Sequence, residues 1–155
     1  MATTRIDPRV WWDTLHKNGR FDLKFFLTTE LEDESNMPSI SDRYNDAADE
    51  IRRLIKEADD NNEGFRSIGS KWSMSSIAHH PDRMHFTANM NIGFPIPSAG
   101  MHANSPYKSE NLFFFQCGNE IKEISHFLES KGKSLKTTGA SNGQTIAGCI
   151  STGVH

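Results

Sequence analysis

The sequence predicts an α+β fold, in which a small mixed or parallel sheet carries packed helices. Two observations lead to this class. Apolar residues recur at helical spacing in two segments, residues 41–60 and 119–131, so each segment is expected to form a helix with one buried face. Short apolar runs bounded by glycine or polar residues precede and follow the second helix, which is typical of short buried strands. Helices and strands that each bury one face favour a layered structure.

The 155 residues suggest one domain with an extension before it. Residues 1–37 mix aromatic clusters with an acidic run and are assigned to an N-terminal extension, and residues 38–155 to the domain. Within the domain, residues 74–110 show little periodicity. We expect an irregular excursion there, either long and ordered or mobile, because loops of that length usually have a function or are disordered.

The helix over residues 41–60 is the clearest element. Its apolar stripe consists of Ala47, Ala48, Ile51, Leu54, Ile55 and Ala58. Ser41 or Asp42 is expected to cap its start, and Gly64 follows its end. Residues 65–68 then form a short strand.

The second helix, over residues 119–131, follows an aromatic strand over residues 113–117. Its stripe consists of Ile121, Ile124, Phe127 and Leu128, and Gly132 ends it. Residues 134–137 are expected to form a third strand, and residues 145–155 a loop. We expect the three strands to join one small sheet on which both helices pack.

Charge and composition exclude several classes. The net charge of −3 gives no electrostatic reason to expect nucleic acid. No apolar run reaches the roughly 20 residues of a membrane span, and the start of the chain lacks the apolar stretch of a signal peptide. The two cysteines are too few for a disulfide framework, so a cytoplasmic location is expected. The hydrophobic share of 35% is low, and we expect a second polypeptide segment to complete the packing.

Two small-residue loops carry the functional signal. The first covers residues 66–73 and reads Arg-Ser-Ile-Gly-Ser-Lys-Trp-Ser. The second covers residues 145–155 and reads Thr-Ile-Ala-Gly-Cys-Ile-Ser-Thr-Gly-Val-His. Glycines let backbone N–H groups approach a ligand closely, and hydroxyls add donors, so such loops can hold a phosphate without Lys or Arg.

In this order the loops resemble the FAD-binding domain of the FAD-linked oxidases, of the vanillyl-alcohol-oxidase or p-cresol-methylhydroxylase (PCMH) type. Arg66, Gly69 and Ser73 match the family's first loop, and the second loop matches its terminal motif. The resemblance covers roughly residues 38–155. It implies the first subdomain of such a domain, truncated at its C-terminal end, in an enzyme that oxidises alcohol-type substrates as an oxidase or a dehydrogenase.

The resemblance also implies a set of FAD-binding residues. One side of the pyrophosphate would be lined by Arg66, Ser67, Ile68, Gly69, Ser70, Lys71, Trp72 and Ser73. The other side would be lined by Gly148, Cys149, Ser151, Thr152 and Gly153. Thr145 and Ile146 would lie near the isoalloxazine ring or the ribityl chain. The resemblance points to no catalytic residue in this chain, because the family's substrate residues come mostly from later parts of the enzyme.

One departure from the family pattern bears on how FAD would be held. Many members attach FAD covalently through a histidine of the first loop, and this chain has Trp72 there. An indole cannot form that bond, so non-covalent FAD is expected. Cys149 is interpreted as a packed small residue rather than a flavin link. The expected partners are FAD and the remainder of the same enzyme, as a continuing or separate polypeptide.

Two other functions remain open. The chain could be a binding or interaction module that kept the layered structure and lost the cofactor. It could also be a metal-binding module, since residues 79–85 contain His79, His80, Asp82 and His85. No second Cys or His cluster completes that site, and Pro81 prevents a regular helical face, so a packed or solvated loop is favoured.

Overall fold

A computed structural model describes residues 1–154, and there the chain is an α+β structure with a small mixed sheet and three α-helices. The four-stranded sheet has the order β1-β4-β6-β5. Its strands are β1 (Thr3–Asp7), β4 (Phe25–Glu30), β6 (Arg83–Phe86) and β5 (Phe65–Ile68). β1 is antiparallel to β4, whereas β6 is parallel to both of its neighbours, β4 and β5. The predicted fold class is confirmed.

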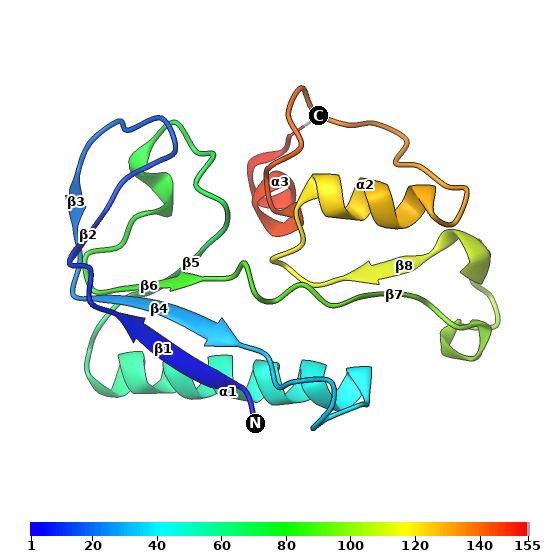
Figure 1. Ribbon diagram of the computed structural model, residues 1–155, viewed down its shortest axis with the longest axis horizontal. Helices are drawn as coiled ribbons and strands as arrows, with labels where there is room; N and C mark the ends of the chain where they lie inside the picture. Colours follow the sequence, from blue (N-terminus) through cyan, green and yellow to red (C-terminus); the bar gives the residue numbers. More distant parts are fainter. Residues whose placement is uncertain (155) are drawn as a thin grey trace.

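Helix α1 (Ile40–Asp60) covers one face of this sheet (Figure 1). It buries Ala47, Leu54 and Ala58, three members of the predicted stripe. The prediction that Ser41 or Asp42 caps the helix is wrong. Ser39 is the cap, because its extended backbone leaves the hydroxyl free to accept a hydrogen bond from the Asp42 N–H at 3.3 Å.

A second layer lies beside the sheet. β7 (Gly93–Pro95) and β8 (Phe113–Phe115) form an antiparallel pair that is covered by α2 (Ile121–Glu129) (Figure 1). Phe127 of α2 meets Phe113 and Phe115 edge to face, with ring centroids 5.9 and 5.4 Å apart. Helix α3 (Ile146–Thr152) adds Cys149 to the same apolar cluster.

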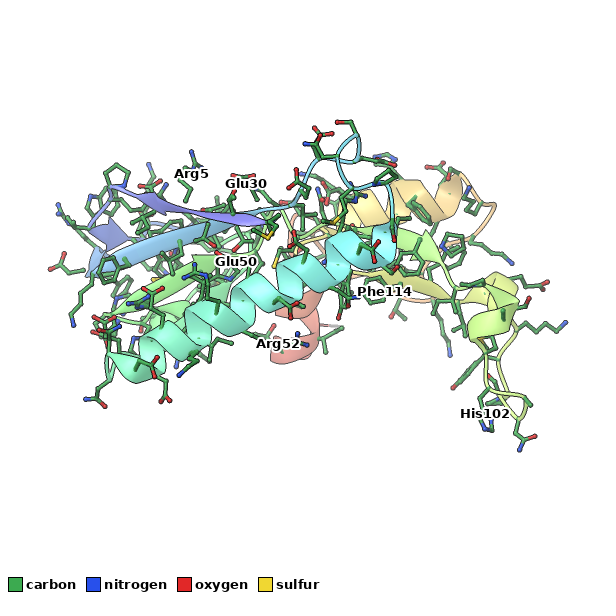
Figure 2. The ribbon with its side chains drawn as sticks, turned by 90° about the horizontal axis from the view of Figure 1, so that it is seen from below. Arg5, Glu30, Glu50, Arg52, His102 and Phe114 are labelled. Carbon is green, nitrogen blue, oxygen red and sulfur yellow. The ribbon has the colours of Figure 1, made fainter. Side chains whose placement is uncertain are left out.

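Short elements complete the chain. β2 (Trp11–Trp12) pairs with β3 (Phe21–Asp22), and three 3₁₀ turns lie at Ser76–Ala78, Ser98–Gly100 and Ser109–Asn111. Figure 2 shows His102 at the tip of the loop between β7 and β8, and Phe114 beside the N-terminal end of α1. There Phe114 meets Tyr44 of α1 edge to face at 5.4 Å, which links the two layers. No helix within residues 1–154 has the length and apolar character that crossing a membrane requires.

Three predictions about the elements are wrong. The strand over residues 113–117 does not join β5, because β8 pairs with β7 in a separate sheet. Residues 134–137 form no strand, and their apolar residue, Leu135, packs against α2 instead of entering a ladder. The terminal segment, expected to be a loop, contains α3.

The segment that was expected to be irregular supplies the strand between β4 and β5. Residues 74–110 contain both β6 and β7, so the segment is not irregular throughout. The first 37 residues, assigned to an extension, supply β1 and β4, which make up half of the four-stranded sheet. The domain boundary after residue 37 stays a prediction, but the sheet needs the residues on both sides of it.

His85 of β6 is fully buried on the sheet face that α1 covers. Its Nε2 lies 2.9 Å from Thr29 Oγ1, and its Nδ1 lies 3.4 Å from Ser67 Oγ. Burial lowers the pKa of His85 to about 4, because a charged imidazolium would lose its hydration there. The ring is therefore neutral near pH 7.

We expect this ring to make stability depend on pH. An unfolded histidine gains a proton as pH falls through its ordinary pKa of 6.5, whereas folded His85 gains none until about pH 4. The unfolding free energy therefore falls as pH drops from 6.5 to 4, by about 3 kcal/mol in total at 1.4 kcal/mol per pH unit. Urea unfolding over this range, compared with His85→Gln, measures it. Parallel curves for the two proteins would contradict the prediction.

Candidate functional site

The first glycine loop begins where β5 ends. Since β5 and β6 are parallel, the loop after Ile68 and the residue after β6, Thr87, lie at the same edge of the sheet. The Thr87 N–H and hydroxyl both donate to the Ile68 carbonyl oxygen, at 3.1 and 3.0 Å, and fix this edge. The carboxyl ends of parallel strands are where open α/β sheets place their ligands.

The second glycine segment is fixed by the start of α2. Glu120 and Thr145 form an antiparallel bridge, and the Ile146 N–H donates to the Asn119 carbonyl oxygen at 2.8 Å. Thr145 is the N-cap of α3, and its hydroxyl accepts from the Gly148 N–H at 3.4 Å. α3 is thereby held on the side of α2 that lies nearest the loop after β5 (Figure 1).

The two loops meet closely, although they are far apart in sequence. A Cβ at Gly69 would lie 2.1 Å from Thr145 Oγ1, so only glycine permits this approach. A Cβ at Gly143 would lie 2.8 Å from the Trp72 ring. The Ser70 hydroxyl donates to the Gly143 carbonyl oxygen at 2.5 Å and ties the segments together.

Between the loops lies a cleft of about 660 Å³. It brings together 13 of the 15 site residues expected from the sequence. The first loop contributes Arg66, Ser67, Ile68, Gly69, Ser70, Lys71, Trp72 and Ser73, and the second contributes Thr145, Gly148, Cys149, Ser151 and Thr152. Ile146 and Gly153 do not line it: Ile146 packs against the α2 cluster, and Gly153 forms the left-handed end of α3.

The cleft has further walls that the sequence analysis missed. They are Trp12, Ile51, Met74, Ile77, Ala78, Thr87, Cys117, Gln144, Ala147 and Val154. Trp12 and Ile51 come from elements far from either loop in sequence, and Thr87 follows the strand that showed no periodicity. No local pattern marks such residues as part of a site, because only the fold brings them together.

Within the described residues, the first loop has backbone N–H groups that no protein group accepts from. In residues 1–154, the part of the chain that is described, the N–H groups of Ser70, Lys71 and Trp72 make no hydrogen bond to another protein group. Lys71 has a φ of +68°, a left-handed turn that reorients successive N–H groups. Such consecutive donors form an anion-binding concavity.

Of the ionisable side chains that line the cleft, Arg66 is hydrogen-bonded and the two cysteines are neutral. The Arg66 guanidinium donates to the carbonyl oxygens of Ile77 and His79, which orders the return of the loop toward β6. Burial raises the pKa of the Cys149 and Cys117 thiols, so neither is a thiolate at neutral pH. Cys149 is a buried member of the α2 cluster.

The histidine segment is spread over separate roles. His79 Nε2 contacts the Asp22 carbonyl oxygen at 2.8 Å, and His80 Nδ1 accepts from the Asp82 N–H at 3.2 Å. His85 lies inside the sheet with Thr29 and Ser67. Over residues 1–154, no three His, Cys, Asp or Glu side chains are grouped so that they could hold a metal ion.

Comparison with known proteins gives a likeness of structure and none of sequence. No protein-family model and no curated protein matches the sequence. Among solved structures, cholesterol oxidase from B. sterolicum matches with a TM-score of 0.69 and 11% sequence identity. The match covers 99% of this chain and 25% of that chain, so this chain spans about a quarter of the oxidase's length. At this identity, the match shows a shared fold.

Proposed function

We propose that the chain is the FAD-binding part of a flavin-dependent oxidoreductase and that its two glycine loops hold the pyrophosphate. The observation that carries the proposal is the cleft, since loops that resemble the two FAD loops of one family both line it. The structural likeness to an oxidase points to the same class of enzyme. A cleft of about 660 Å³ is within the usual range for small-molecule and cofactor sites.

The residues present fit such a cofactor. A pyrophosphate needs several donors in a partly dry space, and the free N–H groups of Ser70, Lys71 and Trp72 supply them without a buried cation. Gly69 and Gly143 let the loops approach, and Thr145 fixes the start of α3. Bound flavin would supply the redox chemistry, acceptance of a hydride from an alcohol-type carbon, and the protein would supply binding and orientation.

In this proposal the remainder of the enzyme supplies the substrate residues. Ile150 and Val154, at the C-terminal end of the described chain, are 75% and 45% exposed, an apolar surface that such a segment would cover. We also propose a cytoplasmic location, because Cys117 and Cys149 are both free thiols.

FAD binding by the chain itself tests the proposal. We expect added FAD to bind, ADP to compete with it, and riboflavin, which lacks phosphate, to compete poorly. Calorimetric titration of FAD into the chain, alone and in the presence of ADP or of riboflavin, measures all three. If saturating FAD shows no binding, the chain is a module without a cofactor and the proposal is wrong. If riboflavin competes as well as ADP, the pyrophosphate is not the anchor.

Non-covalent attachment is part of the proposal, because Trp72 stands where the family has a tethering histidine. Trp72 lines the cleft and packs against Gly143 and His16, and an indole forms no flavin bond. Acid precipitation of the holoprotein should therefore leave all of the yellow colour in the supernatant. Colour that stays with the protein pellet would show a covalent link elsewhere.

The Ser70→Ala variant should bind FAD only slightly less well. The Ser70 hydroxyl donates its proton to the Gly143 carbonyl oxygen. The variant therefore loses one hydrogen bond between the loops and keeps all of the backbone donors. That loss is roughly 1 kcal/mol, or about fivefold in the dissociation constant. The same titration measures it, with Ser98→Ala in the distant 3₁₀ turn as the control. A loss of 100-fold or more would mean that the side chain itself holds the phosphate.

A further inference from the structure

A row of hydrogen bonds runs between the sheet and α1 and reaches the cleft at Ser67. Thr4 Oγ1 donates to Glu50 Oε1 at 2.6 Å, and the hydroxyls of Thr4 and Thr29 lie 3.1 Å apart. Thr29 Oγ1 lies 2.9 Å from His85 Nε2, and His85 Nδ1 lies 3.4 Å from Ser67 Oγ. Figure 2 shows the Glu50 end of this row on α1.

The chemistry of the groups fixes the direction of each bond. Glu50 is ionised and can only accept, since its hydrogen bonds with Arg53 lower its carboxyl pKa, so the single Thr4 proton is committed to it. Thr29 must then donate to Thr4, which leaves Thr29 Oγ1 as an acceptor for the Nε2–H of His85. A neutral imidazole has one N–H, so Nδ1 is an acceptor and Ser67 donates its proton to it.

This direction determines what Ser67 offers to the cleft. The residue is exposed and lines the cleft, but its one proton points to the buried ring. Its oxygen therefore faces a ligand only with lone pairs. A phosphate oxygen also carries only lone pairs, so the two do not pair.

We propose that Ser67, held by His85, is a specificity-determining hydrogen-bond acceptor that recognises an N–H or O–H group of the bound nucleotide rather than its phosphates. The inference rests on the proposed function and deepens it, because it divides the first loop in two. The backbone donors of Ser70, Lys71 and Trp72 face the anion, and the Ser67 oxygen faces an amino, imide or sugar hydroxyl group.

The first test identifies which ring nitrogen of His85 carries the proton, and it needs no ligand. Nitrogen-15 shifts of the ring should show the proton on Nε2 in the unmodified chain at pH 7. Thr4→Val keeps the side-chain shape but frees the Thr29 proton to point at Nε2. This variant should therefore populate the Nδ1–H form. A proton on Nδ1 in the unmodified chain, or no change in Thr4→Val, overturns the inference.

Ligand selectivity is the second test. Calorimetric titrations with FAD and with inorganic pyrophosphate compare the unmodified chain, Ser67→Ala and Ser67→Thr. Ser67→Ala should lower the affinity for FAD roughly fivefold, which corresponds to one hydrogen bond between uncharged groups. The affinity for pyrophosphate should not change. Ser67→Thr, which keeps the hydroxyl, should restore FAD binding.

The outcomes separate the two proposals. If Ser67→Ala lowers the affinity for both ligands equally, or for neither, the role of Ser67 is overturned while FAD binding by the chain stands. If the unmodified chain binds neither ligand, the proposed function is overturned and the ligand assigned to Ser67 falls with it.

Discussion

Valine at position 69 is expected to weaken FAD binding strongly. A Cβ at Gly69 would lie 2.1 Å from Thr145 Oγ1 and 3.1 Å from two other Thr145 atoms, so the valine must push the loop away from the cap of α3. The branched side chain would also narrow the cleft that Gly69 lines. We expect a loss of FAD affinity on the order of 100-fold, corresponding to overpacking of about 3 kcal/mol.

Gly100→Val is the matched control for this substitution. Gly100 lies in the loop between β7 and β8, and a Cβ there would meet only Ile96 and Pro97 at 3.7 Å or more. Flavin anisotropy measures the affinities, and circular dichroism verifies that both variants are folded. If folded Gly69→Val binds FAD within threefold of the unmodified chain, the loop does not hold the cofactor.

The largest loss of stability is expected for Gly118→Ala. A Cβ at Gly118 would lie 1.9 Å from the Thr87 carbonyl oxygen and 2.9 Å from that of Met90, and both are backbone atoms that cannot rotate away. The Gly118 N–H also donates to the Met90 carbonyl oxygen at 2.9 Å. The methyl group must therefore disrupt the contact of Gly118 with the turn at Thr87–Met90. We expect a loss of at least about 3 kcal/mol from the unfolding free energy, which for a domain is about 5–15 kcal/mol.

Gly132→Ala serves as the comparison for the same chemical change. Nothing lies within 4 Å of a Cβ there, but φ is +66°, so the cost is the left-handed backbone alone, about 1 kcal/mol. Urea unfolding of both variants gives the two free energies. Equal losses would mean that the Thr87–Met90 turn yields to the extra methyl group.

Apolar periodicity predicted the helices well and failed for β6. The stripes around Leu54 and Ile124 face the layers as expected, because each helix presents its apolar face to a single layer, but Ile55 of the first stripe is 48% exposed. β6 instead buries a cation and an imidazole. Arg83 is held by Glu57 and Glu63 at 2.8 and 2.6 Å, and His85 by the hydroxyl groups beside it. These partners come from other elements, and Met84 and Phe86, the apolar residues that alternate with the cation and the imidazole, are too few to predict a strand.

The candidate site was predicted in part for a related reason. Glycine and hydroxyl patterns are local, and they located both loops that line the cleft. The helical state of α3, in contrast, does not follow from the residues of that segment alone. Its seven residues include Gly148 and are too few to form a helix alone, so the Thr145 cap and the contact of Cys149 with α2 stabilise it. Trp12 and Ile51 enter the cleft only because the sheet and α1 bring them there.

The strand order has a consequence for how the chain folds. β6 lies between β4 and β5, yet it follows both in sequence. Neither earlier strand has its parallel partner until residue 86 is available, so no hairpin can nucleate this half of the sheet and long loops must close first. We expect slow folding in a single late step. The edge that bears the first glycine loop is formed in that step, so a nascent chain that stops before β6 cannot hold a ligand.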